Sequence, residues 1–219
     1  MPPLRPFLYV LAGVNGAGKS SIGGQLLRQA GLDWFDPDAF ARALVEATGC
    51  EQVAANAAAW QEGLRRLDEA LASGRNHAFE TTLGGNTIPE RIATASRTHD
   101  VLVWFCGLDS PGRHIARVQA REDAGGHAIP ESKVRERYPR ALANLIGLLP
   151  YLSQLQVYDN SVEARDGVIP DPVLVLEIDQ GVLRWPRTAA DLRRTPDWAK
   201  PVVEAVLGSD DGPASIEPA

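Results

Sequence analysis

The sequence predicts an α/β fold with a doubly wound, mostly parallel sheet. Short apolar runs alternate along the 219 residues with segments of helical periodicity. The first apolar run leads into a glycine-rich turn and then a helical pattern, "FLYVLAGVNGAGKSSIGGQLL" at residues 7–27. This length suits one domain with a substantial core. We therefore expect a single domain over residues 1–207 and a disordered tail, "GSDDGPASIEPA", over residues 208–219.

The first elements are predicted from the lengths of the apolar runs and from the glycine and capping residues that bound them. Residues 7–13, "FLYVLAG", read as a short buried strand, and residues 20–31 read as a helix that ends at a glycine. The segment "DWF" at residues 33–35 reads as a short strand end. A helix over residues 36–49 follows, with Asp36 as a candidate N-cap.

A long helix is expected from Glu51 to about Ser73. Its apolar residues recur at helical spacing and predict a stripe that faces the core: Trp60, Leu64, Leu67 and Leu71. A strand over residues 77–82, a helix near residues 88–97 and a strand over residues 100–108 come next.

The second half of the chain continues the alternation. Asp109 and Ser110 are placed to cap a helix over residues 111–123, and a glycine pair separates it from a long helix over residues 130–149, which contains Pro139. Three later strands and a last helix are expected at residues 156–160, 172–178, 181–185 and 195–207. The second and third of these strands are expected to form a hairpin through Asp179–Gly181.

Composition excludes several classes of protein. A net charge of −6 and a pI near 5.3 argue against nucleic-acid and membrane-surface binding. Cys50 and Cys106 lie far apart, show no metal-ligand spacing and are expected to be reduced core residues. The absence of a long apolar stretch or a signal-like start predicts a cytoplasmic protein.

The turn after the first strand fits a phosphate-binding loop. Gly13, Gly18, Lys19 and Ser20 match the pattern G-x-x-x-x-G-K-[ST]. In that pattern backbone N–H groups surround the phosphates, the lysine reaches the β- and γ-phosphates, and the hydroxyl ligates Mg²⁺. The sequence therefore predicts ATP as cofactor, Ser20 as metal ligand and Lys19 in a catalytic role. The predicted nucleotide contacts are Gly13, Asn15, Gly16, Ala17, Gly18, Lys19, Ser20 and Ser21. The alternative is a glycine-rich turn without a ligand.

Polar side chains follow the predicted strands where their carboxyl ends should meet, which is where ligands bind in such sheets. They are Asp36 and Asp38, the run Glu80, Thr81 and Thr82, and Asp109. Phosphoryl transfer needs metal ligands, a carboxylate that accepts the proton of the attacking hydroxyl, and cations over the moving phosphate. The sequence supplies candidates for the carboxylates.

The candidate cations lie on the helix over residues 111–123. Arg117 and Arg121 are four residues apart and precede "GGHAIP", so they suit a lid that closes over a triphosphate, with one guanidinium on the base and one on the phosphates. The alternative is a solvated arginine face at a helix end. Farther on, Arg137 is expected to point inward, whereas Arg135 is expected to be solvated.

Six segments, in order and spacing, resemble the zeta-toxin family of P-loop kinases. They are "LAGVNGAGKSS", "FDPDAFA", "FETTL", "ARVQAREDAGGHAIP", "RERYPRALANL" and "VYDNS", which together span about residues 5–161. The resemblance implies a P-loop kinase fold with a helical lid and phosphorylation of the 3′-hydroxyl of UDP-N-acetylglucosamine. It further implies Asp38 as catalytic base, Glu80 and Thr82 as sugar-nucleotide contacts, and Arg121 as the first lid arginine over the phosphates.

Two positions depart from the family pattern. Asp36 stands where the nearest relatives usually have asparagine, so it is either a rival base or a helix cap. His127 stands where the characterised toxins have a second lid arginine. Either Arg135 or Arg137 replaces that arginine, or the substrate differs, or His127 is a loop residue that only forms hydrogen bonds.

Two classes of function remain open at this stage. The first is a kinase of a small molecule, with a sugar nucleotide, a nucleoside or an antibiotic as acceptor and an antitoxin protein as a partner implied by the resemblance. The predicted acceptor contacts are Asp36, Glu80, Thr81, Thr82, His127 and Arg137. The second is an ATP-binding module that regulates a partner. A regulatory module needs no acceptor base, so Asp38 and the lid arginines favour the kinase.

Overall fold

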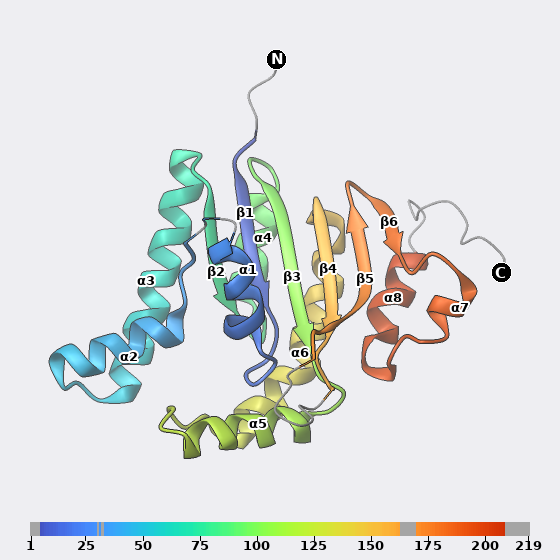
Figure 1. Ribbon diagram of the computed structural model, residues 1–219. Helices are drawn as coiled ribbons and strands as arrows, with labels where there is room; N and C mark the ends of the chain where they lie inside the picture. The colour runs from blue at the N-terminus through green and yellow to red at the C-terminus, as the bar shows by residue number, and fades with distance from the viewer. Residues whose placement is uncertain (1–4, 30, 32, 163–169, 209–219) are drawn as a thin grey trace.

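The computed structural model describes residues 5–29, 31, 33–162 and 170–208. Of the expected tail over residues 208–219, all but Gly208 lies outside the described residues. Six strands form one sheet in the order β2-β1-β3-β4-β5-β6 (Figure 1). Their bounds are β1 Phe7–Ala12, β2 His77–Thr81, β3 Asp100–Gly107, β4 Gln154–Asp159, β5 Val173–Asp179 and β6 Val182–Trp185.

The sheet is parallel at its centre and antiparallel at one edge. β1 pairs in parallel with β2 and β3, and β3 pairs in parallel with β4. β5 and β6 form the antiparallel hairpin expected from the sequence and extend the sheet beyond β4. The parallel pairing brings the carboxyl ends of β1 to β4 to one edge, where the candidate site lies.

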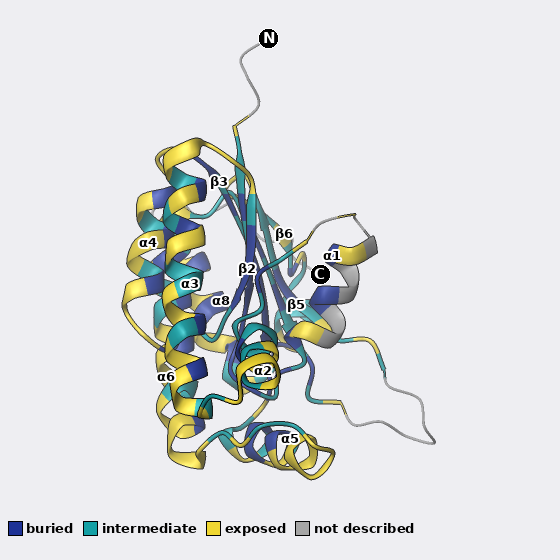
Figure 2. Cartoon of the chain, turned by 90° about the vertical axis from the view of Figure 1, so that its left-hand side faces the viewer, coloured by how far each residue is buried: buried dark blue, intermediate teal, exposed yellow. Residues whose placement is uncertain are grey.

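The helices cover the two faces unequally. In Figure 2, α3, α4, α6 and α8 pack on one face of the sheet, and α1 lies on the other. The bounds are α1 Gly24–Gln29, α2 Pro37–Thr48, α3 Gln52–Ser73, α4 Thr87–Ala95, α5 Pro111–Asp123, α6 Glu131–Leu148, α7 Ala189–Leu192 and α8 Lys200–Leu207. A π-helical turn at Lys19–Gly23 precedes α1, and single 3₁₀ turns lie at Leu149–Tyr151 and Asp197–Ala199.

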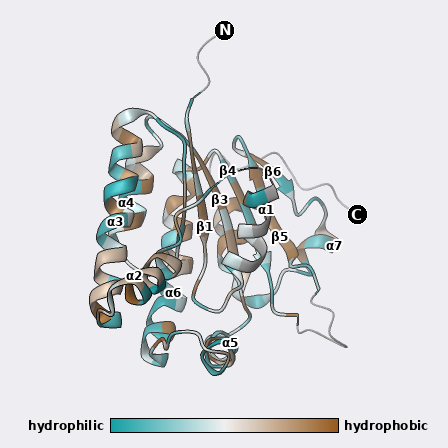
Figure 3. Ribbon diagram, turned by 60° about the vertical axis from the view of Figure 1, so that its left-hand side comes forward, coloured by the Kyte–Doolittle hydropathy of each residue, from teal (hydrophilic) through white to brown (hydrophobic). Residues whose placement is uncertain are grey.

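Alternation along the strands produces a core on each face. Leu8 and Val10 of β1 are fully buried in the larger core, whereas Leu11 packs with Trp104 in a smaller core under α1. The hydropathy colouring of Figure 3 shows the hydrophobic strands between more hydrophilic helix surfaces. A strand buried on both sides reads as a continuous apolar run, which explains the sequence pattern "FLYVLA".

Sequence and structure agree on the main elements and differ in three details. The prediction that Trp60 belongs to the core-facing stripe of α3 is wrong, because Trp60 is 46% exposed. Helical periodicity predicts a face, but the N-terminal half of α3 packs against α2 through the buried Ala55 and Ala59, and Trp60 stays largely exposed. Cys50 is only partly buried, unlike Cys106, although both are free thiols as expected. The short helix α7, which Thr188 and Asp191 cap reciprocally, was not expected.

Candidate active site

The phosphate loop connects β1 to the helical turn at Lys19 and requires glycine at its entrance. Gly13 has φ +136°, and a Cβ there would lie 2.1 Å from the carbonyl oxygen of Cys106 on β3. Any side chain would therefore push the loop off the sheet. The loop is anchored to β2 as well, because the Gly13 N–H donates to the Thr81 carbonyl over 3.2 Å.

Neighbouring elements hold the loop backbone from outside. The Asn160 amide, just after β4, donates to the Ala17 carbonyl over 2.9 Å. The His114 ring on α5 lies with Nδ1 2.8 Å from the Asn15 carbonyl oxygen. A carbonyl can only accept, so Nδ1 carries the hydrogen. The loop is thus fixed by side chains from β4 and α5 before any ligand binds.

Lys19, Ser20 and Glu80 form a polar cluster at the start of the helical turn. Lys19 Nζ lies 3.4 Å from Glu80 Oε1, and the Ser20 hydroxyl donates to both Glu80 carboxylate oxygens over 2.9 and 3.1 Å. Burial raises the pKa of Glu80, while the Lys19 charge and the Ser20 hydrogen bond oppose that rise. Glu80 therefore lies beside the two residues that a phosphate loop uses for phosphate and metal.

The oxygen donors here fit Mg²⁺ in chemical type. Ser20 Oγ and the Glu80 carboxylate are hard oxygen ligands, and Asp36 and Asp38 line the same cavity. Among the described residues, no group of three or more His, Cys, Asp or Glu side chains is arranged to hold a metal by itself. Mg²⁺ with one or two protein ligands, the rest coming from phosphates and water, is the common arrangement at nucleotide sites.

Asp36 lies beside Glu80 because of a single parallel bridge between Phe35 and Phe79 of β2. Its side chain caps α2, since Asp36 Oδ1 accepts from the backbone N–H groups of Asp38 at 2.9 Å and Ala39 at 3.1 Å. The capping role that the sequence left open for Asp36 is therefore the one that these contacts favour.

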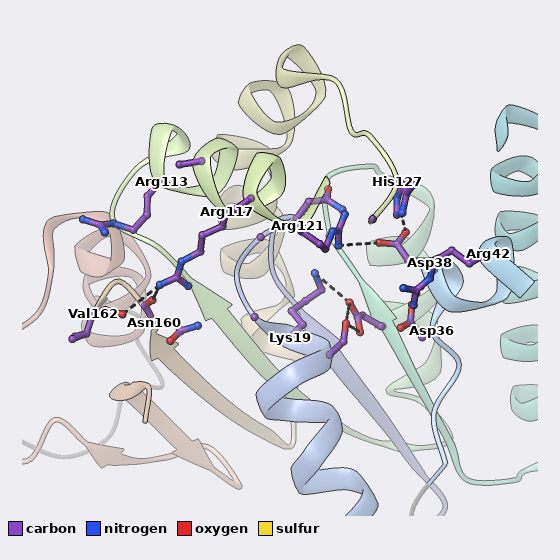
Figure 4. A pocket seen from close by; sticks show the side chains of 18 residues that line it. Lys19, Asp36, Asp38, Arg42, Arg113, Arg117, Arg121, His127, Asn160 and Val162 are labelled. Atoms are coloured by element: carbon purple, nitrogen blue, oxygen red, sulfur yellow. Dashed lines mark hydrogen bonds and ion pairs between the residues drawn. The ribbon is translucent and has the colours of Figure 1, made fainter. Parts of the chain in front are cut away.

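Asp38 lies in the first turn of α2 and faces Arg121 and His127 from the α5 side of the cavity (Figure 4). Arg121 Nη1 lies 3.9 Å from Asp38 Oδ2, and His127 Nε2 lies 3.9 Å from Asp38 Oδ1. Arg121 belongs to the last turn of α5, and His127 belongs to the following "GGHAIP" segment. The expected lid residues therefore converge on the expected catalytic base.

Arg117 points toward the segment after β4 (Figure 4). Its Nη2 donates to the backbone carbonyls of Asn160 over 2.8 Å and of Val162 over 3.3 Å. The guanidinium thus lines the cavity at the end away from Asp38. This position is compatible with the expected contact to a nucleotide base, which stays a prediction.

These groups enclose one cavity of about 680 Å³. Lysine and arginine side chains outnumber carboxylates in its lining, in which Lys19, Arg42, Arg113, Arg117 and Arg121 face Asp36, Asp38 and Glu80. A chain with a net charge of −6 therefore concentrates cations at this cavity. Such a lining suits a polyanion, and a triphosphate is the polyanion that a phosphate loop takes.

Three predicted residues lie elsewhere. Thr81, Thr82 and Arg137 line a second, smaller cavity next to the first. Arg137 is partly buried and points inward, as expected, whereas Arg135 is exposed and paired with Glu131 at 2.6 Å. Neither Arg135 nor Arg137 lines the cavity that contains Lys19, whereas His127 does line it. The side chain of Ser21 lies outside the described part of the chain.

Three lining residues were missed by the sequence reasoning. Arg42 lies one helical turn after Asp38, and that spacing was an available signal. Asn160 directly follows β4 and fits the rule that selected the other polar residues at strand ends. Arg113 lies one turn before Arg117 and pairs with Asp109 at 2.9 Å, so it extends the arginine face of α5.

The His114 contact leads to a prediction about pH and stability. Burial lowers the pKa of His114 from 6.5 to about 4, so the folded protein keeps the imidazole neutral where the unfolded chain protonates it. Stability should therefore fall as the pH drops from about 6.5 to about 4, by at most about 3 kcal/mol from this group. His114→Gln, which does not titrate, should lose less stability over this window.

Denaturant unfolding at several pH values measures this difference between the two proteins. The raised pKa of Glu80 acts in the opposite direction, since the folded state then binds more protons, but it contributes equally to both. Parallel curves for the wild type and His114→Gln would contradict the prediction.

Comparison with known families matches residues 8–141, more than half of the chain, to a family described as an AAA domain (AAA_33). The chain belongs to this AAA domain family. A 61-residue stretch of the chain is 38% identical to an uncharacterised protein of Haemophilus influenzae and covers 27% of the chain and 44% of that protein.

Solved structures share the fold of this AAA domain. The crystal structure of AvrRxo1-ORF1:-ORF2 with ATP superimposes with a TM-score of 0.62 at 17% identity, over 83% of this chain and 60% of that chain. The PezAT toxin-antitoxin system of Streptococcus pneumoniae gives 0.52 at 15% identity, over 77% and 71%. A putative kinase from Chloroflexus aurantiacus gives 0.51 at 18% identity, over 63% and 80%.

These likenesses confirm the predicted α/β fold with a mostly parallel sheet of P-loop kinase type. The chain spans less than two thirds of the AvrRxo1 chain and of the Haemophilus protein. Among the described residues, no helix is long and apolar enough to cross a membrane.

Proposed function

We propose that this AAA domain is an ATP-dependent kinase that transfers the γ-phosphate to a hydroxyl group. The 3′-hydroxyl of UDP-N-acetylglucosamine, or of a related sugar nucleotide, is the proposed acceptor. One observation carries the proposal: Asp38 shares a single cavity with Lys19 of the phosphate loop, and Arg121 and His127 each lie 3.9 Å from that same carboxylate. A site that only binds a nucleotide does not need such a carboxylate.

Each residue has a role that its position supports. Lys19 would bind the β- and γ-phosphates, and the loop N–H groups would surround them. Asp38 would accept the proton of the acceptor hydroxyl, and Arg121 would then turn to the transferring phosphoryl group. Ser20 and Glu80 would hold Mg²⁺, which screens the phosphate charges when bound.

The acceptor assignment rests on the zeta-toxin resemblance, and Thr81 and Thr82, two of its predicted acceptor contacts, line the second cavity next to the nucleotide cavity. His127 in place of a second lid arginine leaves a weaker cation near the phosphates, so a different acceptor, such as a nucleoside or an antibiotic, is the main competitor. An antitoxin partner is proposed by the same resemblance, since the PezAT structure is described as a toxin-antitoxin system.

The acceptor is tested by incubation with ATP, Mg²⁺ and a panel of sugar nucleotides, nucleosides and aminoglycosides, with transferred phosphate detected by mass spectrometry. Phosphorylation of a sugar nucleotide supports the proposed acceptor. Phosphorylation of another class keeps the kinase and replaces the acceptor. ATP binding without transfer to any hydroxyl would favour a regulatory ATP-binding module.

Nucleotide binding is tested at Lys19. Lys19→Ala should lose the rise in melting temperature that ATP–Mg²⁺ gives the wild type, because a ligand that binds only the native state stabilises it. Lys133→Ala is the matched control, since Lys133 is exposed, pairs with Glu136 at 3.1 Å and should leave the shift unchanged. Equal shifts for Lys19→Ala and the wild type would contradict a phosphate-binding role for the loop.

A further inference from the structure

The second cavity, of about 260 Å³, lies between α3, α6 and the segment that follows β2. Arg137 on α6 lines it, yet its guanidinium also reaches the phosphate loop. Arg137 Nη1 donates to the Asn15 side-chain oxygen over 2.8 Å, and Asn15 is only 5% exposed and lines the larger cavity. One side chain therefore connects the two cavities.

The segment over residues 82–85, called the acceptor-side loop below, packs against the aliphatic part of the Arg137 side chain. A Cβ on Gly84 would lie 2.5 Å from Arg137 Cγ and 2.9 Å from its Cβ. These atoms belong to the base of the side chain and cannot swing aside as a free end could. The backbone of the loop and the arginine stem are thus in close contact.

The acceptor-side loop is also fixed to α6. Leu83 is buried and has φ +52°, a strained conformation for a branched side chain. Asn144 on α6 donates to the Leu83 carbonyl over 2.6 Å and to the Gly85 carbonyl over 3.0 Å. Two hydrogen bonds therefore tie the loop to α6, the helix that also carries Arg137.

We propose that Arg137 is a positioning residue that connects the acceptor-side loop to the phosphate loop. Its hydrogen bond fixes the Asn15 side chain, while His114 fixes the Asn15 backbone. A group that moves the acceptor-side loop then changes the hold on Asn15 and thereby the affinity for ATP. The proposal rests on the proposed function, because ATP binding is the property that Arg137 controls.

The first test removes the guanidinium of Arg137 and keeps the aliphatic part of its side chain. Arg137→Met retains the packing against Gly84 but loses the hydrogen bond, and it should weaken ATP–Mg²⁺ binding about tenfold, as expected for a charged donor to a buried acceptor. Arg137→Lys keeps a donor and should restore part of the affinity. Arg140→Ala is the matched control, because Arg140 lines the same cavity and pairs with Glu136 at 2.6 Å.

The second test acts from a distance. Gly84→Ala should weaken ATP binding several-fold by displacing Arg137, although Gly84 does not line the nucleotide cavity. Gly85→Ala should have no effect, since a Cβ there meets nothing within 4 Å. In the Arg137→Met background, Gly84→Ala should cause no further loss of ATP affinity, even if the melting temperature falls further. If Gly84→Ala only damaged the fold, its losses of ATP affinity and of melting temperature would both add to those of Arg137→Met.

Isothermal titration of each variant with a non-hydrolysable ATP analogue and Mg²⁺ provides the affinities. Non-additive losses for Gly84→Ala and Arg137→Met support the proposal. Wild-type affinity in Arg137→Met, or strictly additive losses, would overturn it while leaving the kinase assignment intact. If the wild type itself does not bind the analogue, the proposed function fails first and the positioning role fails with it.

Discussion

Asp38→Asn is expected to lower the rate of phosphate transfer by about 10²- to 10⁴-fold while leaving ATP affinity near that of the wild type. The change keeps the shape of the side chain and removes its ability to accept a proton. Asp38 is 39% exposed toward the cavity, so the amide replacement costs little packing. A single-turnover assay with the phosphorylated acceptor as readout, beside a binding titration, measures the two quantities separately.

Asp36→Asn is the matched control for this prediction. Asp36 caps α2 through Oδ1, and asparagine caps a helix about as well as aspartate, so this variant should lose little activity. A larger loss at Asp36 than at Asp38 would reverse the assignment of the base. Unchanged transfer in both variants would remove the need for a carboxylate base in this site.

Arg121→Ala is expected to lower the transfer rate by about 10³-fold, the range found for arginines that stabilise a transferring phosphoryl group. Arg121 is 42% exposed and lies 3.9 Å from Asp38, a distance at which the ion pair adds little to stability. Its removal should therefore leave the melting temperature nearly unchanged. Steady-state kinetics and thermal unfolding of the same preparation measure both effects.

Arg135→Ala controls for the loss of an exposed arginine. Arg135 is paired with Glu131 on α6 and does not line the nucleotide cavity, so its removal should leave the rate unchanged. Wild-type turnover in Arg121→Ala would mean that the C-terminal face of α5 is an ordinary solvated helix surface. The convergence of Arg121 and His127 on Asp38 would then have no part in the chemistry.

The lid geometry also bears on the substitution of histidine for arginine. His127 is largely buried, with 13% of its side chain exposed, and its Nε2 lies 3.9 Å from Asp38 Oδ1. An imidazole is a weaker phosphate ligand than a guanidinium. Neither Arg135 nor Arg137 lines the cavity beside His127, and what replaces the second lid arginine stays a prediction.

Local sequence determined the parts of the site whose physics is local. The phosphate-loop spacing, the Asp36 cap and the strand–helix alternation each depend on residues within a few positions of one another. Chain direction in a parallel sheet then brings strand ends together, which is why Asp38 and Glu80 could be expected in one site.

Contacts between distant segments were decided by the tertiary structure. The Arg137–Asn15 hydrogen bond joins residues 122 positions apart, and no periodicity encodes it. Packing of β2 against the phosphate loop places Glu80 beside Lys19 and Ser20, a pairing that no local pattern indicates, while its contact with an acceptor stays a prediction. Trp60 follows helical spacing yet remains exposed, because a pattern gives the face of a helix and not the surface it meets.

The sequence by itself therefore determined the fold class, the spacing of the phosphate loop and most, but not all, of the candidate side chains. The tertiary structure decided which of those side chains share a cavity and which partner each one has. The physical reason is the sequence distance over which each effect acts. Dihedral preferences and hydrophobic period act over a few residues, whereas the distance between Lys19 and Glu80, or between Arg121 and Asp38, depends on how β1, β2, α2 and α5 pack together.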